Sequence, residues 1–265
     1  MTLIEAIILG IIQGLTEFLP VSSSGHLELG AIVLGLETSN NLLFSIIVHA
    51  ATALSTIVVF RKEILTLIKD LFAFKWNEST EYIAKIAVSM IPVFIVGVFF
   101  EDKVEALFSG QILLVSSMLF VTGLLLLISH YTKPKDGSVT FGKSIIIGLA
   151  QAIAIMPGIS RSGSTITTAL FLGVDRSKAA RFSFLMVLPP ILGAALLKTL
   201  ELMDSGTTLG SNISTLALIA GFIAAFVAGL LACTWMIRLV RKGKLVYFAI
   251  YCFVIAFVGI VATFI

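Results

Sequence analysis

The sequence predicts an all-α polytopic membrane protein with six transmembrane helices and two re-entrant helical hairpins, arranged as an inverted-topology internal repeat. Three observations carry this prediction. The chain of 265 residues is 58% hydrophobic and 12% charged, with a mean hydropathy of +1.09, whereas soluble domains are about 25% charged. Its basic residues gather in alternate loops, and one Ser/Gly-rich pattern occurs twice along the chain.

Six apolar stretches are long enough to cross a bilayer, which takes roughly 20 residues of helix. They are approximately Asn41–Phe60, Tyr82–Phe100, Ile112–His130, Phe182–Leu200, Ile213–Met236 and Leu245–Ile265. Two further apolar regions, residues 3–36 and 144–173, are interrupted by Pro, Gly and Ser. Each therefore predicts two short helical arms around a polar turn, which is the pattern of a re-entrant hairpin.

The distribution of basic residues supports this arrangement. With six spans and two re-entrant hairpins, 15 of the 18 Lys and Arg residues fall on one side of the membrane. The positive-inside rule makes that side the cytoplasm. We therefore expect a multi-pass protein of the plasma (inner) membrane. Arg161 is the one basic residue that this topology leaves within the hydrocarbon region.

A repeat with an offset of 138 residues relates the two interrupted regions. Gly10, Gln13, Ser22, Ser24 and Gly25 match Gly148, Gln151, Ser160, Ser162 and Gly163. Three predicted spans separate the copies, and an odd number of spans inverts one copy relative to the other. We expect a single membrane domain over 1–265, made of inverted repeats at approximately 1–130 and 140–265, with a site between them near the bilayer midplane.

Candidate site residues come from both interrupted regions. Ser/Gly loops that open helices bind anions through their backbone N–H groups. A guanidinium inside the membrane suggests a functional site, and its planar fork suits phosphate. The predicted ligand is therefore a phosphate or diphosphate on an apolar carrier. The candidate catalytic residues are Glu17, Ser23, His26 and Arg161, and the candidate phosphate-binding residues are Gln13, Ser22, Ser24, Ser160, Ser162 and Thr165.

Less specific interpretations apply to some of these residues. Ser22–Ser24 could simply cap the following helix, although capping explains one serine better than three. Arg161 could form a purely structural pair with Glu17. His49 lies within a predicted span and is expected to pack in the core, since its counterpart at the 138-residue offset is Val187. The sequence shows no structural-zinc spacing and no nucleotide-binding motif, and nothing in it suggests nucleic-acid binding.

The segments Gln13-Gly-Leu-Thr-Glu17-Phe-Leu-Pro-Val-Ser-Ser-Ser-Gly-His26 and Pro157-Gly-Ile-Ser-Arg161-Ser-Gly-Ser-Thr165 resemble the two signature motifs of the undecaprenyl-diphosphatase family of bacitracin-resistance phosphatases. The resemblance implies an enzyme that hydrolyses undecaprenyl diphosphate to the monophosphate and inorganic phosphate, recycling the lipid carrier of cell-wall synthesis. It also implies six spans with two re-entrant pairs and a site open to the outer face. It also favours a divalent cation, Mg²⁺ or Ca²⁺, as cofactor, and the motifs do not identify which residues would bind it.

One departure concerns the first motif, where the family has Glu or Gln and this chain has Gln13. Glu17 is thus the only carboxylate of that motif, so the motif does not supply the second carboxylate that a two-carboxylate scheme would need. The nucleophile stays open between Ser23, His26 and a water molecule. The competing hypothesis is a transporter or flippase of a phosphorylated polyprenyl lipid, because inverted repeats with broken helices are common in transporters. Gly and Ala in the spans suit either a monomer core or a homodimer seam.

Overall fold

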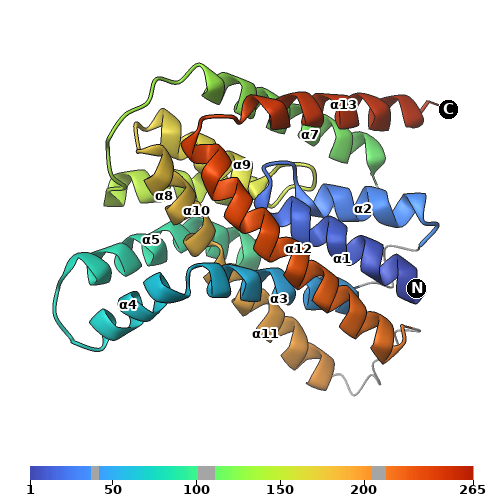
Figure 1. The fold of residues 1–265 in the computed structure, drawn as a ribbon, viewed down its shortest axis with the longest axis horizontal. Coiled ribbons are helices and arrows are strands. Elements are labelled where there is room, and N and C mark those ends of the chain that lie inside the picture. Colours follow the sequence, from blue (N-terminus) through green and yellow to red (C-terminus); the bar gives the residue numbers. More distant parts are fainter. Residues whose placement is uncertain (37–41, 101–110, 205–212, 265) are drawn as a thin grey trace.

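The computed structural model describes residues 1–36, 42–100, 111–204 and 213–264, and these ranges are almost entirely helical (Figure 1). The helices of the first half are α1 (Leu3–Phe18), α2 (Ser23–Val33), α3 (Leu42–Val59), α4 (Arg61–Leu71), α5 (Glu78–Phe99) and α7 (Ile112–His130). Those of the second half are α8 (Phe141–Ile153), α9 (Arg161–Phe171), α10 (Arg176–Met186), α11 (Leu188–Asp204), α12 (Thr215–Arg241) and α13 (Val246–Ala262). Within the described ranges, the only β-type pairing is an isolated bridge between Gly137 and Val174.

Both interrupted regions form two short helices joined by a loop. α1 and α2 contact each other, as do α8 and α9. At 16 residues, α1 is the longest of the four, and a helix of that length spans only about 24 Å, less than the roughly 30 Å of a bilayer core. The prediction of two short arms around each polar turn is thus confirmed for these residues.

Among the described residues, four helical stretches are long and apolar enough to cross a membrane, or five if the bent pair α3 and α4 counts as one span. The predicted span Ile112–His130 coincides with α7, and α5 and α12 lie close to their predicted ranges. α13 has 17 residues and belongs to the shorter apolar helices. Asn41, the predicted start of one span, lies outside the described residues.

The predicted span Phe182–Leu200 is divided at Val187 into α10 and α11. Pro189 and Pro190 explain the break, because they occupy the first turn of α11, where a missing backbone N–H is tolerated. The stretch Arg176–Leu197 is still apolar enough over 22 residues to cross a membrane. The interruption places the start of α11 beside the loops that open α2 and α9.

The helices pack closely where a glycine faces the backbone of a neighbouring helix. α1 lies along α12, and a Cβ added at Gly14 would lie 2.5 Å from the carbonyl oxygen of Ala225. On the other side of the molecule, Gly148 of α8 meets the backbone of Ser89 in α5 in the same way. These contacts hold α1 and α8 in place, and each leads into one of the two polar loops.

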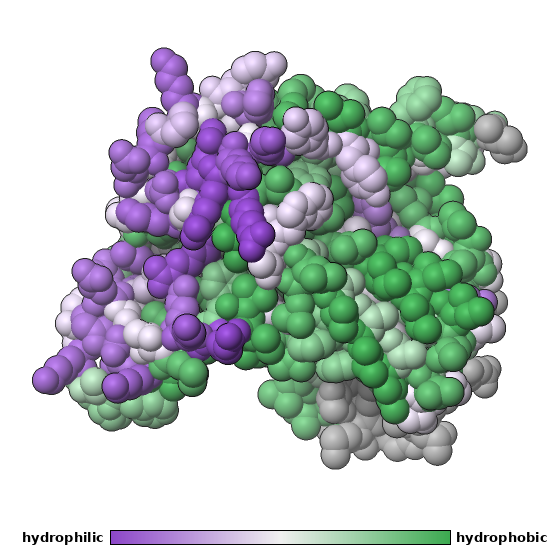
Figure 2. Space-filling model, in the orientation of Figure 1, coloured by the Kyte–Doolittle hydropathy of each residue, from purple (hydrophilic) through white to green (hydrophobic). Residues whose placement is uncertain are grey.

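The surface divides into a polar and an apolar region (Figure 2). Hydrophilic residues gather over α4, the start of α5 and α10, where basic residues of the predicted cytoplasmic side lie. Large apolar side chains are exposed along the other helices, among them Phe94, Leu231 and Phe257 at 67%, 67% and 70%. Such exposure would be unfavourable in water and suits a hydrocarbon surrounding.

Candidate active site

The loops that open α2 and α9 have the same local structure. Ser22 caps α2 by accepting a hydrogen bond from the backbone N–H of Gly25 (3.3 Å), and Ser160 caps α9 by accepting one from Gly163 (3.0 Å). In each loop the capping hydroxyl also lies near the hydroxyl two residues later, Ser24 at 3.4 Å and Ser162 at 3.3 Å. The sequence repeat is therefore a repeated helix start, and each start contributes partial positive charge.

Glu17, at the end of α1, is the hub that joins the two loops. Its carboxylate is buried and forms an ion pair with Arg161 through Oε1. Its Oε2 accepts hydrogen bonds from the Ser23 hydroxyl (2.7 Å) and from the Gln13 side-chain amide (2.8 Å). Ser23 and Arg161 are the first residues of α2 and α9, so two helix starts converge on one carboxylate.

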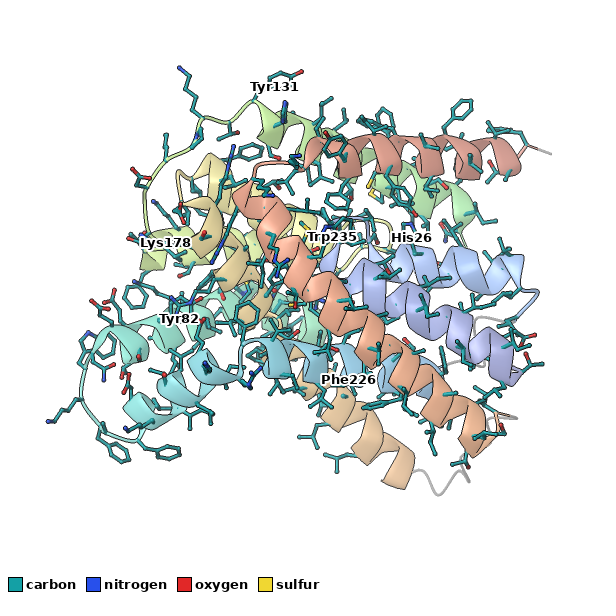
Figure 3. All side chains as sticks on the ribbon, in the orientation of Figure 1. His26, Tyr82, Tyr131, Lys178, Phe226 and Trp235 are labelled. Atoms are coloured by element: carbon teal, nitrogen blue, oxygen red, sulfur yellow. The ribbon has the colours of Figure 1, made fainter. Side chains whose placement is uncertain are left out.

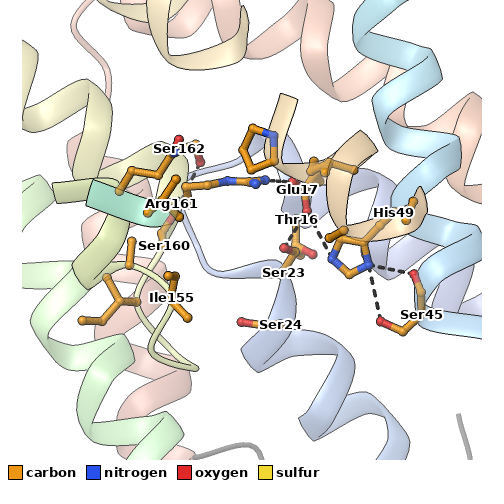
Figure 4. A pocket seen from close by; sticks show the side chains of 18 of the residues that line it. Thr16, Glu17, Ser23, Ser24, Ser45, His49, Ile155, Ser160, Arg161 and Ser162 are labelled. Atoms are coloured by element: carbon orange, nitrogen blue, oxygen red, sulfur yellow. Dashed lines mark hydrogen bonds and ion pairs between the residues drawn. The ribbon is translucent and has the colours of Figure 1, made fainter. Parts of the chain in front are cut away.

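A cavity of about 380 Å³ opens in front of this hub (Figure 4). Arg161 reaches Glu17 from one side of the cavity, and Ser23 from another. The predicted site residues that line it are Glu17, Ser23, Ser24, Ser160, Arg161 and Ser162. The rest of its wall is largely apolar and includes Ile46, Val93, Ile155 and Ile191. The cavity thus combines a polar end that suits an anion with walls that suit a hydrocarbon.

Four predicted residues lie outside the cavity lining. The Gln13 side-chain amide donates a hydrogen bond to Glu17 without lining the cavity, and the Ser22 hydroxyl caps α2. The hydroxyls of Thr165 and Ser183 share a hydrogen bond (2.5 Å), and the Thr165 hydroxyl also donates one to the backbone carbonyl oxygen of Arg161 (2.9 Å). Ser22 has a φ of 68°, which is uncommon for a residue other than glycine and is often found at functional sites.

His26 also points away from the cavity. Its Nδ1 lies 2.8 Å from the carbonyl oxygen of Ser22, and its Nε2 lies 2.9 Å from the hydroxyl of Tyr251 in α13. The two rings stack with centroids 5.5 Å apart, and Figure 3 shows His26 on the α2 side that faces α13. Both ring nitrogens are therefore engaged, which favours Ser23 over His26 as the attacking group.

Sequence reasoning missed four polar residues of the lining, namely Thr16, Ser45, His49 and Gln151. His49 of α3 lies with Nε2 4.0 Å from Glu17 Oε2, and Ser45 lies one turn before it. The match of Phe44-Ser45 with Phe182-Ser183 at the 138-residue offset was the available signal for that part of α3. Gln151, the counterpart of Gln13, also lines the cavity, and its buried Oε1 has no hydrogen-bond partner.

The cavity does not offer a metal cage made by protein side chains. In the part of the chain that the structure describes, no group of three His, Cys, Asp or Glu residues could hold a metal ion. Glu17 is the sole acidic residue among those lining the cavity, and both its oxygens already accept hydrogen bonds. The hydrogen-bond donors of the cavity, such as Ser23 and Arg161, suit phosphate oxygens. They do not suit a resident Mg²⁺, which prefers several oxygen ligands.

The chain is similar over nearly its whole length to proteins of one family. Residues 6–258 match the family model described as bacitracin resistance protein BacA. A Bacteroides fragilis protein named undecaprenyl-diphosphatase is 55% identical over 260 residues, covering 98% of this chain and 97% of that protein. Proteins of the same name from Parabacteroides distasonis and Methanobrevibacter smithii are 53% and 39% identical, over 99% and 97% of this chain and 99% and 96% of their own lengths.

Proposed function

The chain belongs to the BacA family of bacitracin resistance proteins, and we infer that it is a membrane hydrolase that converts undecaprenyl diphosphate to undecaprenyl phosphate and inorganic phosphate. The single observation that carries this function is the convergence of Ser23 and Arg161 on the buried carboxylate of Glu17. A hydroxyl and a guanidinium at two helix N-termini, both held by one carboxylate, suit phosphoryl transfer. The enzyme returns the lipid carrier to peptidoglycan synthesis.

We propose that Ser23 attacks the terminal phosphorus. Its hydroxyl already donates to Glu17 Oε2 (2.7 Å), which orients the oxygen and accepts the proton as the bond to phosphorus forms. Arg161 and the first turns of α2 and α9 stabilise the charge that develops on the phosphoryl oxygens. The hydroxyls of Ser24, Ser160 and Ser162 line the same cavity and bind the diphosphate. Water then hydrolyses the phosphoserine.

We propose that a divalent cation, Mg²⁺ or Ca²⁺, would accompany the diphosphate of the substrate. Both carboxylate oxygens of Glu17 already accept hydrogen bonds from protein side chains, so the diphosphate is a better source of oxygen ligands than Glu17. Such a cation would neutralise phosphate charge.

We propose that six spans and two re-entrant hairpins form an inverted repeat in the plasma membrane, with the cavity open to the outer face. Two features support the inverted repeat. α1 packs on α12 and α8 packs on α5, and these pairs correspond at the 138-residue offset. Hydrophilic residues also gather on one side of the molecule in Figure 2, over α4, the start of α5 and α10, which carry many of the basic residues. The positive-inside rule assigns that side to the cytoplasm. A homodimer stays a prediction.

The test is phosphate release from undecaprenyl diphosphate by purified protein in detergent with Mg²⁺ or Ca²⁺. We expect release by the wild type and its loss in the Glu17→Gln and Arg161→Ala variants, with each variant eluting as a folded protein in gel filtration. If folded wild-type protein binds the lipid but releases no phosphate, hydrolysis is refuted in favour of lipid transport.

A further inference from the structure

His49 is the titratable side chain of the cavity to which the mechanism above gives no task. It lies in the middle of α3 and its side chain is 29% exposed, toward the cavity. Its Nε2 lies 4.0 Å from Oε2 of Glu17, the same oxygen that accepts the Ser23 hydroxyl (Figure 4).

The other ring nitrogen defines the state of this imidazole. Nδ1 lies 2.8 Å from the backbone carbonyl oxygen of Ser45. A carbonyl oxygen accepts hydrogen bonds and cannot donate them, so Nδ1 carries a hydrogen. In the neutral ring, Nε2 therefore has its lone pair free and aimed at the cavity. The hydrogen bond to Ser45 thus presents a proton acceptor next to Glu17, by the same logic that orients histidine in other active sites.

Glu17 on its own is poorly suited to keep a proton. Protonation would remove the negative charge that the Arg161 guanidinium pairs with at Oε1 and that the Gln13 amide donates to at Oε2. An unpaired guanidinium at such a site is unfavourable. A proton that passes from Glu17 to a neighbouring base restores both interactions. Gln13 and Arg161 cannot take it up at neutral pH, whereas His49 can.

The surroundings of His49 contain few competing charges. Across the cavity it faces Glu17 of α1 and, beyond that carboxylate, Arg161 of α9. The α11 residues that line the cavity beside it are uncharged, namely Pro190, Ile191, Ala194 and Ala195. In α12, which packs along α3, residues 215–235 include no Asp, Glu, Lys, Arg or His. Glu17 is therefore its proton-exchange partner among the described side chains.

We propose that His49 is a proton relay for the phosphatase reaction, accepting through Glu17 the proton that Ser23 loses. The proposal rests on the proposed function and deepens it. In the first step, the Ser23 oxygen bonds to the terminal phosphorus, and the bond from that phosphorus to the bridging oxygen breaks. The bridging oxygen leaves with the electron pair as the polyprenyl monophosphate. The hydroxyl proton moves to Glu17 Oε2 and then to His49 Nε2.

The second step consumes one water molecule. The water oxygen bonds to phosphorus and keeps one hydrogen as inorganic phosphate. Its other hydrogen passes through Glu17 to the Ser23 oxygen as the bond between that oxygen and phosphorus breaks. His49 gives its stored proton to solvent when the phosphate leaves, so one proton is released in each turnover.

The experiment compares His49→Asn with the wild type by phosphate release from undecaprenyl diphosphate over a range of pH. The asparagine side-chain NH₂ can replace Nδ1–H as the donor to Ser45, but it cannot take up a proton. We expect kcat to fall about 100-fold, within the usual contribution of acid–base groups, with KM unchanged. The fall of the wild-type rate at acidic pH, where His49 is already protonated, should disappear in the variant.

Two further variants complete the design. His49→Gln places an uncharged amide near the position of Nε2 and should behave like His49→Asn. His130→Asn, at the exposed end of α7, should keep the wild-type rate and pH profile. The proposal is overturned if His49→Asn keeps its kcat and its acidic decline, if the loss falls on KM alone, or if both His49 variants unfold. A wild type that releases no phosphate refutes the proposed function instead.

Discussion

Adding a single methyl group at Gly14 should impair the active site without touching any of its polar groups. A Cβ at this position would lie 2.5 Å from the carbonyl oxygen of Ala225, 2.7 Å from the Cβ of Ala228 and 2.9 Å from the amide nitrogen of Gly229. All three atoms belong to α12, and two of them are backbone atoms that cannot rotate away. The Gly14→Ala substitution must therefore separate α1 from α12.

The size of the separation follows from these distances. Ordinary contact starts at 3.4 Å, so α1 must shift by about 0.9 Å at Gly14 if α12 stays fixed, a strain of the kind that costs about 1–3 kcal/mol in overpacked cores. Glu17 lies three residues further along the same helix and moves with it. A displacement of about 1 Å at reacting groups can reduce the rate about 100-fold.

The assay is phosphate release together with thermal unfolding in the same detergent. Gly97→Ala in α5 is the matched control, because a Cβ at Gly97 meets nothing within 4 Å. The control should keep the wild-type rate and gain up to about 1 kcal/mol of stability. If Gly14→Ala and Gly97→Ala cannot be distinguished in rate and stability, the close packing of α1 on α12 does not position Glu17.

Three other substitutions test the hub around Glu17. Arg161→Lys keeps the positive charge but loses the planar fork, so phosphate release should fall at least about tenfold; an unchanged rate would show that charge alone is sufficient. Ser23→Ala should lose turnover and the phosphoenzyme trapped by rapid quenching with substrate labelled at its terminal phosphate. Ser24→Ala should still form the phosphoenzyme and should mainly raise KM, because Ser24 lines the cavity that binds the diphosphate; a labelled Ser23→Ala protein would assign the attack to another group. Gln13→Glu replaces an amide donor 2.8 Å from Glu17 Oε2 with a second negative charge, which Glu17 would repel. A divalent cation would offset this repulsion, so removing it with a chelator should lower phosphate release more steeply in the variant than in the wild type. An equal response of the two proteins would contradict the expected repulsion.

Much of the site could be predicted because its signals are local. A proline or glycine next to several serines interrupts an apolar helix wherever the chain goes, and Ser22 and Ser160 both cap helices as such a pattern implies. The pairing of Glu17 with Arg161 spans 144 residues, yet it follows from the fact that each lies beside one copy of the same loop. Repetition thus supplied the long-range information.

The directions of His26 and His49 could not be predicted, because they depend on distant packing. His26 lies next to the serine run in the sequence. Its Nε2 forms a hydrogen bond with the hydroxyl of Tyr251 in α13, 225 residues away, and this contact holds the ring outside the cavity. His49 has no polar counterpart at the 138-residue offset, so a lone histidine in an apolar helix indicated the core. Which face of α3 meets the cavity is decided by its contacts with α11 and α12.

The two copies of the loop have diverged at the position where the chemistry takes place. Ser23 and Arg161 correspond at the 138-residue offset and start equivalent helices, yet one donates a hydroxyl to Glu17 Oε2 and the other a guanidinium to Oε1. The counterpart of Glu17 is Ile155, which lines the apolar side of the cavity. A carrier that alternates between two faces gains from equivalent halves, whereas an attacking group and a charge stabiliser must differ. The asymmetry at this pair of positions is therefore the physical reason to expect hydrolysis from this scaffold.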